Sequence, residues 1–168
     1  DLGVSYLSAS KSLSASIVDL DLTNTRIGDS ALRHIGSSMV SLSDLELNNT
    51  SVTFEGIVHL ASIARSLRLI GLSSCRHIGD EVFDTLNGLK YLEVLDLSRT
   101  GVTNRGVSEL RLKYLERLNL NGSFCTDLVW IGIKGCPALR LVSLRALRKP
   151  PQPEGMMQVG NEGNADEE

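Results

Sequence analysis

Four carboxylates occupy matching positions in two segments of this chain, at Asp19, Asp21, Asp44 and Glu46. The second segment follows the first by 25 residues (44 − 19 = 25 and 46 − 21 = 25). Carboxylates held close together repel one another, so a basic segment of a partner would bind them well. Water and counter-ions, or Arg26 and Arg68 reaching across, would equally supply the counter-charge. A divalent cation would bind such a cluster only weakly, and no ligand spacing supports that use.

The cysteines and serines form no pattern that indicates catalysis or a metal site. Cys75, Cys125 and Cys136 include no C-x-x-C pair, and an odd number of cysteines favours free thiols in a reducing compartment. The serines of 8–16 and 37–43 are expected in loops between repeats. No G-x-S-x-G motif or glycine-rich phosphate loop is present. The sequence therefore predicts a non-enzymatic protein with no cofactor and no metal.

A repeat supplies the elements that would position the four carboxylates. The spacing L-x-x-L-x-L, with Ile or Val in some places, starts at residues 17, 42, 67, 92, 115 and 139. Its last two apolar residues lie two apart and share one face of a strand, so the residues between them point the other way. In the second half of each repeat the apolar residues fall three or four apart, as in a helix. This period predicts an α/β leucine-rich repeat solenoid, a right-handed curved array with parallel strands on the concave face and helices on the convex face.

The outward-pointing residues of the strands form the predicted binding face. Along the repeats this concave face changes from acidic, through mildly apolar, to basic. The predicted partner-binding residues are Asp19, Asp21, Asp44, Glu46, Asn48, Leu69, Val94, Asp96, Arg99, Arg117, Asn119, Asn121 and Arg145.

The repeat also sets the expected domain organisation. Residues 1–148 form one solenoid domain, and 149–168 form a tail rich in Pro, Gly and acidic residues that cannot bury a core and is expected to be disordered. Residue 1 lies in mid-repeat, because Asp1-Leu2-Gly3-Val4-x-x-Leu7 matches the second half of the other repeats. Residues 1–16 are therefore expected to be a partial repeat with further sequence upstream.

Three local predictions follow from the repeat. Asp29 and Asp80 precede helical segments and are expected to cap their free backbone N–H groups. Trp130 falls on the same apolar position as Phe83 and is expected in the core. The ninth position carries a small residue whose side chain is expected to bond the backbone of a neighbouring repeat. These ninth-position residues are Thr25, Thr50, Cys75, Thr100 and Ser123.

Two segments resemble one class of leucine-rich repeat. Leu72-Ser73-Ser74-Cys75-Arg76-His77-Ile78-Gly79-Asp80 resembles the L-x-x-C-x-x-I-T-D element of cysteine-containing repeats. Gly135-Cys136-Pro137-Ala138-Leu139-Arg140-Leu141-Val142-Ser143-Leu144 resembles their G-C-P-x-L-x-x-L-x-L junction. Such repeats are typical of F-box and leucine-rich proteins and of related adaptors. The resemblance implies a protein–protein interaction module, such as the substrate-recognition part of an F-box-type ubiquitin-ligase subunit. The alternative is a structural subunit of a large ciliary, mitochondrial or ribosome-associated assembly.

Overall charge and hydropathy narrow the expected partners. The formal net charge of −3 gives no basic field that would attract nucleic acid. No apolar run approaches the roughly 18 residues of a membrane span. We therefore expect a protein partner with a basic segment, no nucleic acid and no membrane, and a location inside the cell, in the cytoplasm or nucleus.

Overall fold

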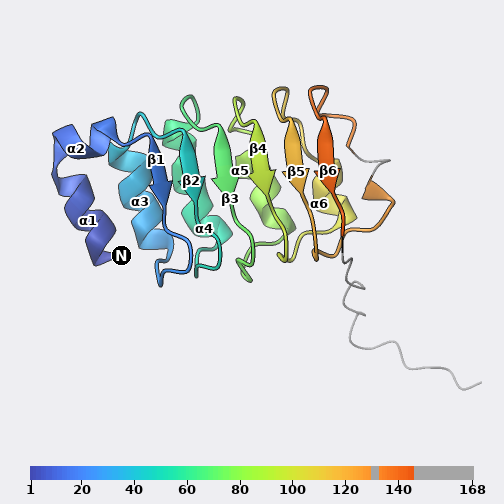
Figure 1. Cartoon of the computed structure of the whole chain (residues 1–168), viewed down its shortest axis with the longest axis horizontal. Helices are drawn as coiled ribbons and strands as arrows, with labels where there is room; N and C mark the ends of the chain where they lie inside the picture. The colour runs from blue at the N-terminus through green and yellow to red at the C-terminus, as the bar shows by residue number, and fades with distance from the viewer. Residues whose placement is uncertain (130–132, 146–168) are drawn as a thin grey trace, which may run out of the picture.

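Six short parallel strands lie side by side in chain order and form one sheet (Figure 1). The computed structural model describes residues 1–129 and 133–145. Each strand pairs in register with the next, so that their central residues form one apolar ladder. The predicted α/β class with parallel strands is confirmed. The strands are β1 (Asp19–Asp21), β2 (Asp44–Glu46), β3 (Leu69–Gly71), β4 (Val94–Asp96), β5 (Arg117–Asn119) and β6 (Leu141–Ser143).

The helices lie behind the sheet and leave its other face bare (Figure 1). The longest is α3 with ten residues, and the helical elements after it are pieces of α-helix and 3-10 helix of three to six residues. The helical elements are α1 (Leu2–Ala9), α2 (Lys11–Ser16), α3 (Asp29–Ser38), α4 (Phe54–Ile57), η1 (Val58–Ile63), η2 (Asp80–Val82), α5 (Phe83–Leu86) and α6 (Asn104–Ser108). The serine-rich segment 8–16 was expected in a loop, and this prediction is wrong: α1 and α2 include most of it. The loop predicted for 37–43 begins only after α3, which ends at Ser38.

The repeated leucines fill the space between the sheet and the helices. In the second unit, Leu42, Leu45 and Leu47 have no exposed surface, and Phe83 of α5 is equally buried. Each such side chain contributes about 1.5–3 kcal/mol relative to an exposed one. In the first unit Ile17 is only partly buried, because β1 has a neighbouring strand on one side alone. Trp130 and the tail 149–168 lie outside the described residues.

A tight turn follows each strand. Thr50 Oγ1 donates to the Leu47 carbonyl at 2.7 Å, and Thr100 Oγ1 donates to Leu97 at 2.6 Å. The prediction that these hydroxyls bond a neighbouring repeat is therefore wrong, since each turn folds back onto its own strand. Cys75 differs, because its Sγ lies 3.1 Å from the Leu47 carbonyl of the preceding repeat.

Asp29 and Asp80 do not cap their own helices, so that prediction is also wrong. The N-cap of α3 is Gly28, which has no side chain to accept a hydrogen bond. Asp29 instead accepts from both the backbone N–H and the Oγ1 of Thr53 in the next repeat, each at 2.8 Å. Asp80 accepts in the same way from Thr103, at 2.8 and 2.6 Å. We call this pair of hydrogen bonds the Asp–Thr clasp.

In the clasp, the threonine that caps one helix also donates to the carboxylate of the preceding repeat. Thr103 Oγ1 also accepts from the backbone N–H of Arg105 at 3.2 Å, so the clasped threonine is itself the N-cap of α6. Gly106 leaves the room that the carboxylate needs, since a Cβ there would lie 2.3 Å from Asp80 Oδ1. The two clasps therefore fix α4 relative to α3, and α6 relative to η2.

Removing a clasp carboxylate is expected to destabilise the protein. Asp80→Ala should lower the free energy of unfolding by about 1.5–3 kcal/mol, because the part-buried N–H and hydroxyl of Thr103 lose a charged acceptor. Urea denaturation measures this change. Asp84→Ala is the matched control, since Asp84 is exposed on α5, and its effect should stay within about 0.5 kcal/mol. Equal losses for the two variants would contradict a role of the clasp in stability.

Candidate functional site

The bare face of the sheet presents two rows of outward-pointing side chains, which we call the strand face. The parallel register aligns them, so each residue lies directly beside its equivalent in the next strand. The first row is Asp19, Asp44, Leu69, Val94, Arg117 and Leu141. The second row is Asp21, Glu46, Gly71, Asp96, Asn119 and Ser143. The structure thus brings together nine of the predicted binding residues.

Asn48, Asn121 and Arg145 follow the strands, and both asparagines hold the backbone of the next repeat. Asn48 Oδ1 accepts from the Ser73 N–H at 2.8 Å, while its Nδ2 donates to Glu46 Oε2 at 2.7 Å. Asn121 Oδ1 accepts from the N–H of Arg145. Both amide oxygens are therefore bonded within the repeat structure, and Asn48 also orients the Glu46 side chain.

Arg99 lies apart from the two rows of the strand face. Its φ of 56° places it in the left-handed region, as for Asn24, Asn49 and Ser74 at the same position of earlier repeats. Asparagine tolerates this conformation better than most residues, and Gly122 occupies it in the fifth unit with a φ of 69°. Arg99 consequently lines an open hollow with Asn24, Asn49 and Ser74, beyond the ends of the strands.

Among the described residues, the carboxylates at the acidic end of the strand face have no ion-pair partner. Asp19 faces Asp44, and Asp21 faces Glu46, across the β1–β2 pair. Within residues 1–129 and 133–145, the ion pairs are Arg68–Glu93 at 3.7 Å and Arg140–Glu116 at 3.9 Å, and neither includes these carboxylates. The Arg68 side chain turns instead to the carbonyls of residues 65–67. The repulsion between the facing carboxylates is therefore left to solvent or to a partner.

Glu46 is the carboxylate of the acidic end on which burial and neighbouring negative charges act together. Burial raises the pKa of its carboxyl, the hydrogen bond from Asn48 lowers it, and the charges of Asp21, Asp96 and Asp19 raise it further. The Glu46 carboxylate lies over Gly71, where a Cβ would come within 1.7 Å of Oε2. In the sequence, a glycine at a strand position where the other repeats carry polar side chains indicates this close approach. Gly71 was not among the predicted binding residues.

Asp21 differs from Glu46 because it is exposed and locally bonded. Its Oδ1 accepts from the Thr23 N–H at 2.8 Å, and hydrogen bonding to Thr23 lowers the pKa of the Asp21 carboxyl. Asp96 of β4 adds a further negative charge to the second row. Its Oδ2 accepts a hydrogen bond from Asn119 Nδ2 of β5 at 2.9 Å. The second row therefore remains acidic as far as β4 and then becomes uncharged, with Asn119 and Ser143.

The cysteines do not add reactive chemistry. Cys75, Cys125 and Cys136 are all free and buried. Burial raises the pKa of the Cys125 and Cys136 thiols, and a thiol that stays protonated is a poor nucleophile. Among the described residues, no three His, Cys, Asp or Glu side chains are placed to hold a metal ion. None of the helices in 1–129 and 133–145 has both the length and the apolar character of a membrane span.

Comparison with known proteins identifies one unit of this array. A family model described as a leucine-rich repeat matches residues 88–110, which include β4 and α6. A comparison with curated proteins gives no match. The matched unit shares its strand register and its buried leucines with the units on either side. Repeats of this kind build extended surfaces for protein interaction.

The raised pKa of Glu46 predicts a stability change that depends on pH. Because this pKa is higher in the folded protein than in the unfolded chain, the charged form destabilises the fold at neutral pH. The penalty disappears once the pH falls below the ordinary range of glutamates, about 4.3. Glu46→Gln should therefore raise the free energy of unfolding at pH 7 by about 0.2–1 kcal/mol, the range of one cross-strand pair.

Urea denaturation at pH 7 and pH 3 tests this prediction, and the gain should shrink toward zero at pH 3. Glu55→Gln is the matched control, because Glu55 is exposed in the first turn of α4, where a negative charge is favourable. That variant should give no gain at pH 7. A loss of stability in Glu46→Gln at pH 7 would show that the Asn48 hydrogen bond outweighs burial and repulsion.

Proposed function

We propose that this protein is a non-enzymatic protein–protein interaction module whose strand–helix units together form a leucine-rich repeat solenoid. Its acidic end, made of Asp19, Asp21, Asp44 and Glu46, binds a basic segment of a protein partner. The match of residues 88–110 to a leucine-rich repeat and the six parallel strands support this proposal.

The observation that carries the proposal is the pairing of like charges across β1 and β2 without an ion pair among the described residues. A Lys or Arg side chain placed between two facing carboxylates would replace repulsion by attraction, and the surrounding field would speed its arrival. Leu69 and Val94 offer partly exposed apolar surface beside this end. Arg117 lies further along the same row, so the charge of the face changes sign and would set the direction in which a partner lies.

The adaptor version of this function is a substrate-recognition surface of an F-box-type ubiquitin-ligase subunit. The segments around Cys75 and Cys136 that resemble cysteine-containing repeats support it. Three free cysteines suit a reducing compartment inside the cell, the cytoplasm or the nucleus.

The second candidate is a structural subunit of a large assembly. Leu2 and Tyr6 of α1 are each 75% exposed, and Leu141 of β6 is 53% exposed. Apolar side chains at both ends of the array are the kind of surface that neighbouring subunits cover. This version uses the ends of the array and leaves the acidic strand face unused.

Charge reversal on the strand face should abolish recognition of a basic partner. We expect Asp21→Lys/Glu46→Lys to weaken binding of a lysine-rich peptide by roughly tenfold or more, because two attractions become repulsions. Fluorescence anisotropy with a labelled peptide of alternating lysine and serine measures the Kd. Raised salt should weaken wild-type binding in parallel, since the charges are exposed.

Glu55→Lys/Asp84→Lys is the matched control, with the same change in net charge on exposed residues of α4 and α5. If this control weakens peptide binding as much as the strand-face variant does, net charge alone governs binding and the proposed site is wrong. Circular dichroism of both variants establishes that they remain folded.

Co-purification separates the two versions of the function. Mass spectrometry of proteins that accompany the wild type and the Asp21→Lys/Glu46→Lys variant should find a ubiquitin-ligase scaffold with both. It should also find a basic protein with the wild type alone. A fixed set of subunits that the variant retains in full would favour the structural-subunit version instead.

A further inference from the structure

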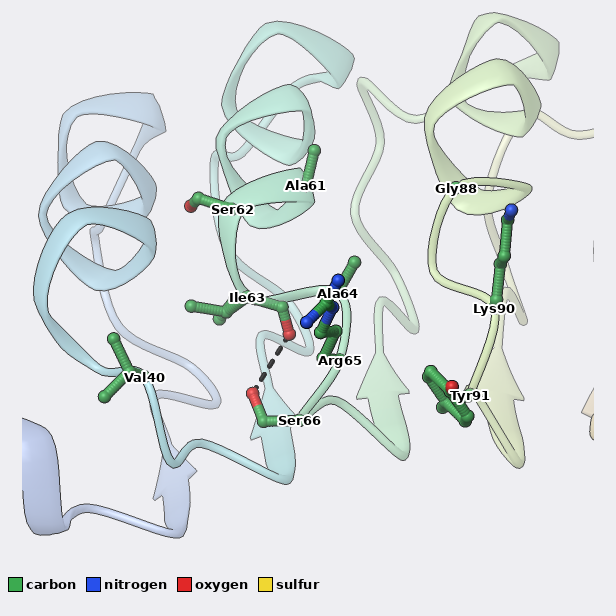
Figure 2. A pocket seen from close by; sticks show the side chains of 10 residues that line it. All are labelled: Val40, Ala61, Ser62, Ile63, Ala64, Arg65, Ser66, Gly88, Lys90 and Tyr91. Carbon is green, nitrogen blue, oxygen red and sulfur yellow. Dashed lines mark hydrogen bonds between the residues drawn. The ribbon is translucent and has the colours of Figure 1, made fainter.

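Two hollows adjoin one another where the chain leaves the helices and enters β3, β4 and β5. The first has a volume of about 640 Å³ and is formed by three successive repeats, as Figure 2 shows. Val40 comes from the turn after α3, Ala61 and Arg65 from η1 and the turn after it, and Tyr91 from the turn before β4. The second hollow shares Lys90 and Tyr91 with the first. We call the joint surface the basic–aromatic edge: Arg65, Lys90, Tyr91, Arg111, Lys113 and Tyr114.

The charge of this edge is of one sign. Four of its residues are cationic, and none of the described residues that line either hollow is acidic. None of the four cations forms an ion pair with any residue in 1–129 or 133–145. Arg111 is held in place by hydrogen bonds from its Nη1 to the Ser108 and Leu110 carbonyls, each at 2.7 Å. The four cations are exposed, so the edge presents positive charge to solvent although the whole chain has a formal net charge of −3.

Two tyrosines form the centre of the edge. The rings of Tyr91 and Tyr114 stack with centroids 5.8 Å apart and an angle of 9° between their planes. The Arg68 guanidinium lies 5.1 Å from the Tyr91 centroid, and Lys113 Nζ lies 5.4 Å from that of Tyr114. Tyr91 and Tyr114 are nevertheless 45% and 44% exposed. Stacked rings that remain this exposed form a rigid platform of low conformational entropy, as is common in binding surfaces.

We propose that the basic–aromatic edge binds an acidic, extended segment of a protein partner, with an apolar side chain placed beside its carboxylates. Charge complementarity determines the class of partner, since Arg65, Lys90 and Lys113 would receive carboxylates. The apolar side chain enters the first hollow, where Val40 is 62% exposed and Ala61 lies at the surface (Figure 2). This site is separate from the strand face and takes a partner of the opposite charge.

The ring geometry favours a peptide over a single-stranded nucleic acid. Bases bind such proteins by stacking on open aromatic faces. Tyr91 lies between Arg68 of the preceding unit and Tyr114 of the following unit. Arg68 covers one face of its ring, and the Tyr114 ring covers the other. Lys113 lies over Tyr114. Stacking a base would therefore displace a group already in place, whereas carboxylates bind to the cations without disturbing the rings.

Binding of two labelled probes of equal charge to the full chain tests the proposal. One is a peptide of Asp and Glu with a central leucine, and the other is an oligo-dT. The peptide should bind more tightly than oligo-dT. Lys90→Glu/Lys113→Glu should weaken peptide binding by roughly tenfold or more, and Lys90→Gln/Lys113→Gln should weaken it by less. Arg33→Glu/Arg105→Glu, with the same charge change on exposed helix residues, should leave most of the affinity.

Four results would overturn the proposal. Equal peptide affinity in the wild type and Lys90→Glu/Lys113→Glu would remove the site, and tighter binding of oligo-dT would assign it to nucleic acid. Self-association in sedimentation that Lys90→Glu/Lys113→Glu abolishes would assign the edge to a second copy of this chain. A roughly tenfold gain in peptide affinity in Asp166→Asn/Glu167→Gln/Glu168→Gln would show that the chain's own acidic end competes for it. The strand-face variant Asp21→Lys/Glu46→Lys should still bind the peptide, so the two proposals fail separately.

Discussion

The fixed register between successive units is the constraint on which the rest of this structure depends. Three-residue strands make few hydrogen bonds, so the register is held chiefly by the apolar ladder that the central strand residues bury between the sheet and the helices. A shift of one residue would turn Leu45 toward solvent and Asp44 or Glu46 toward the core. The same register places every outward residue beside its equivalent, and it thereby produces both the facing carboxylates and the row that contains Gly71.

The period of the sequence predicted the strands, their faces and most of the core, because these depend on spacing within a single unit. Leu42, Leu45 and Leu47 are buried as the pattern indicates, and Asp19 and Asp21 point outward as expected. Contacts between units were predicted poorly. An aspartate before a helix normally caps that helix, yet Asp29 and Asp80 bond to threonines more than twenty residues later. The partner of such a carboxylate depends on how two units stack, and no local pattern gives that information.

Of the two candidate sites, likewise, one could be predicted from spacing within a unit and the other depends on contacts between units. The strand face could be found from the sequence, because its residues alternate with the buried leucines. The basic–aromatic edge could not, since Arg65, Lys90 and Lys113 lie in three different units and each looks like an ordinary surface cation. Only the stacking of Tyr91 on Tyr114 and the two adjoining hollows show that they form one surface. The two proposed sites consequently differ in charge, so two partners of opposite charge would be able to bind at once.

The Asp–Thr clasp also bears on how such a chain can change its length during evolution. In each of the two clasps one unit supplies the carboxylate and the unit after it supplies the threonine. Asp80 accepts hydrogen bonds from Thr103 in this way. At the next junction the amide of Asn104 takes the place of the carboxylate and bonds to Thr126. A second copy of the unit that contains Thr103 and Asn104 would bring one threonine and one amide, so the junctions on both sides of it would remain satisfied. Gain or loss of that unit is therefore structurally neutral at its junctions, whereas an insertion between Asn104 and Thr126 would break one of them.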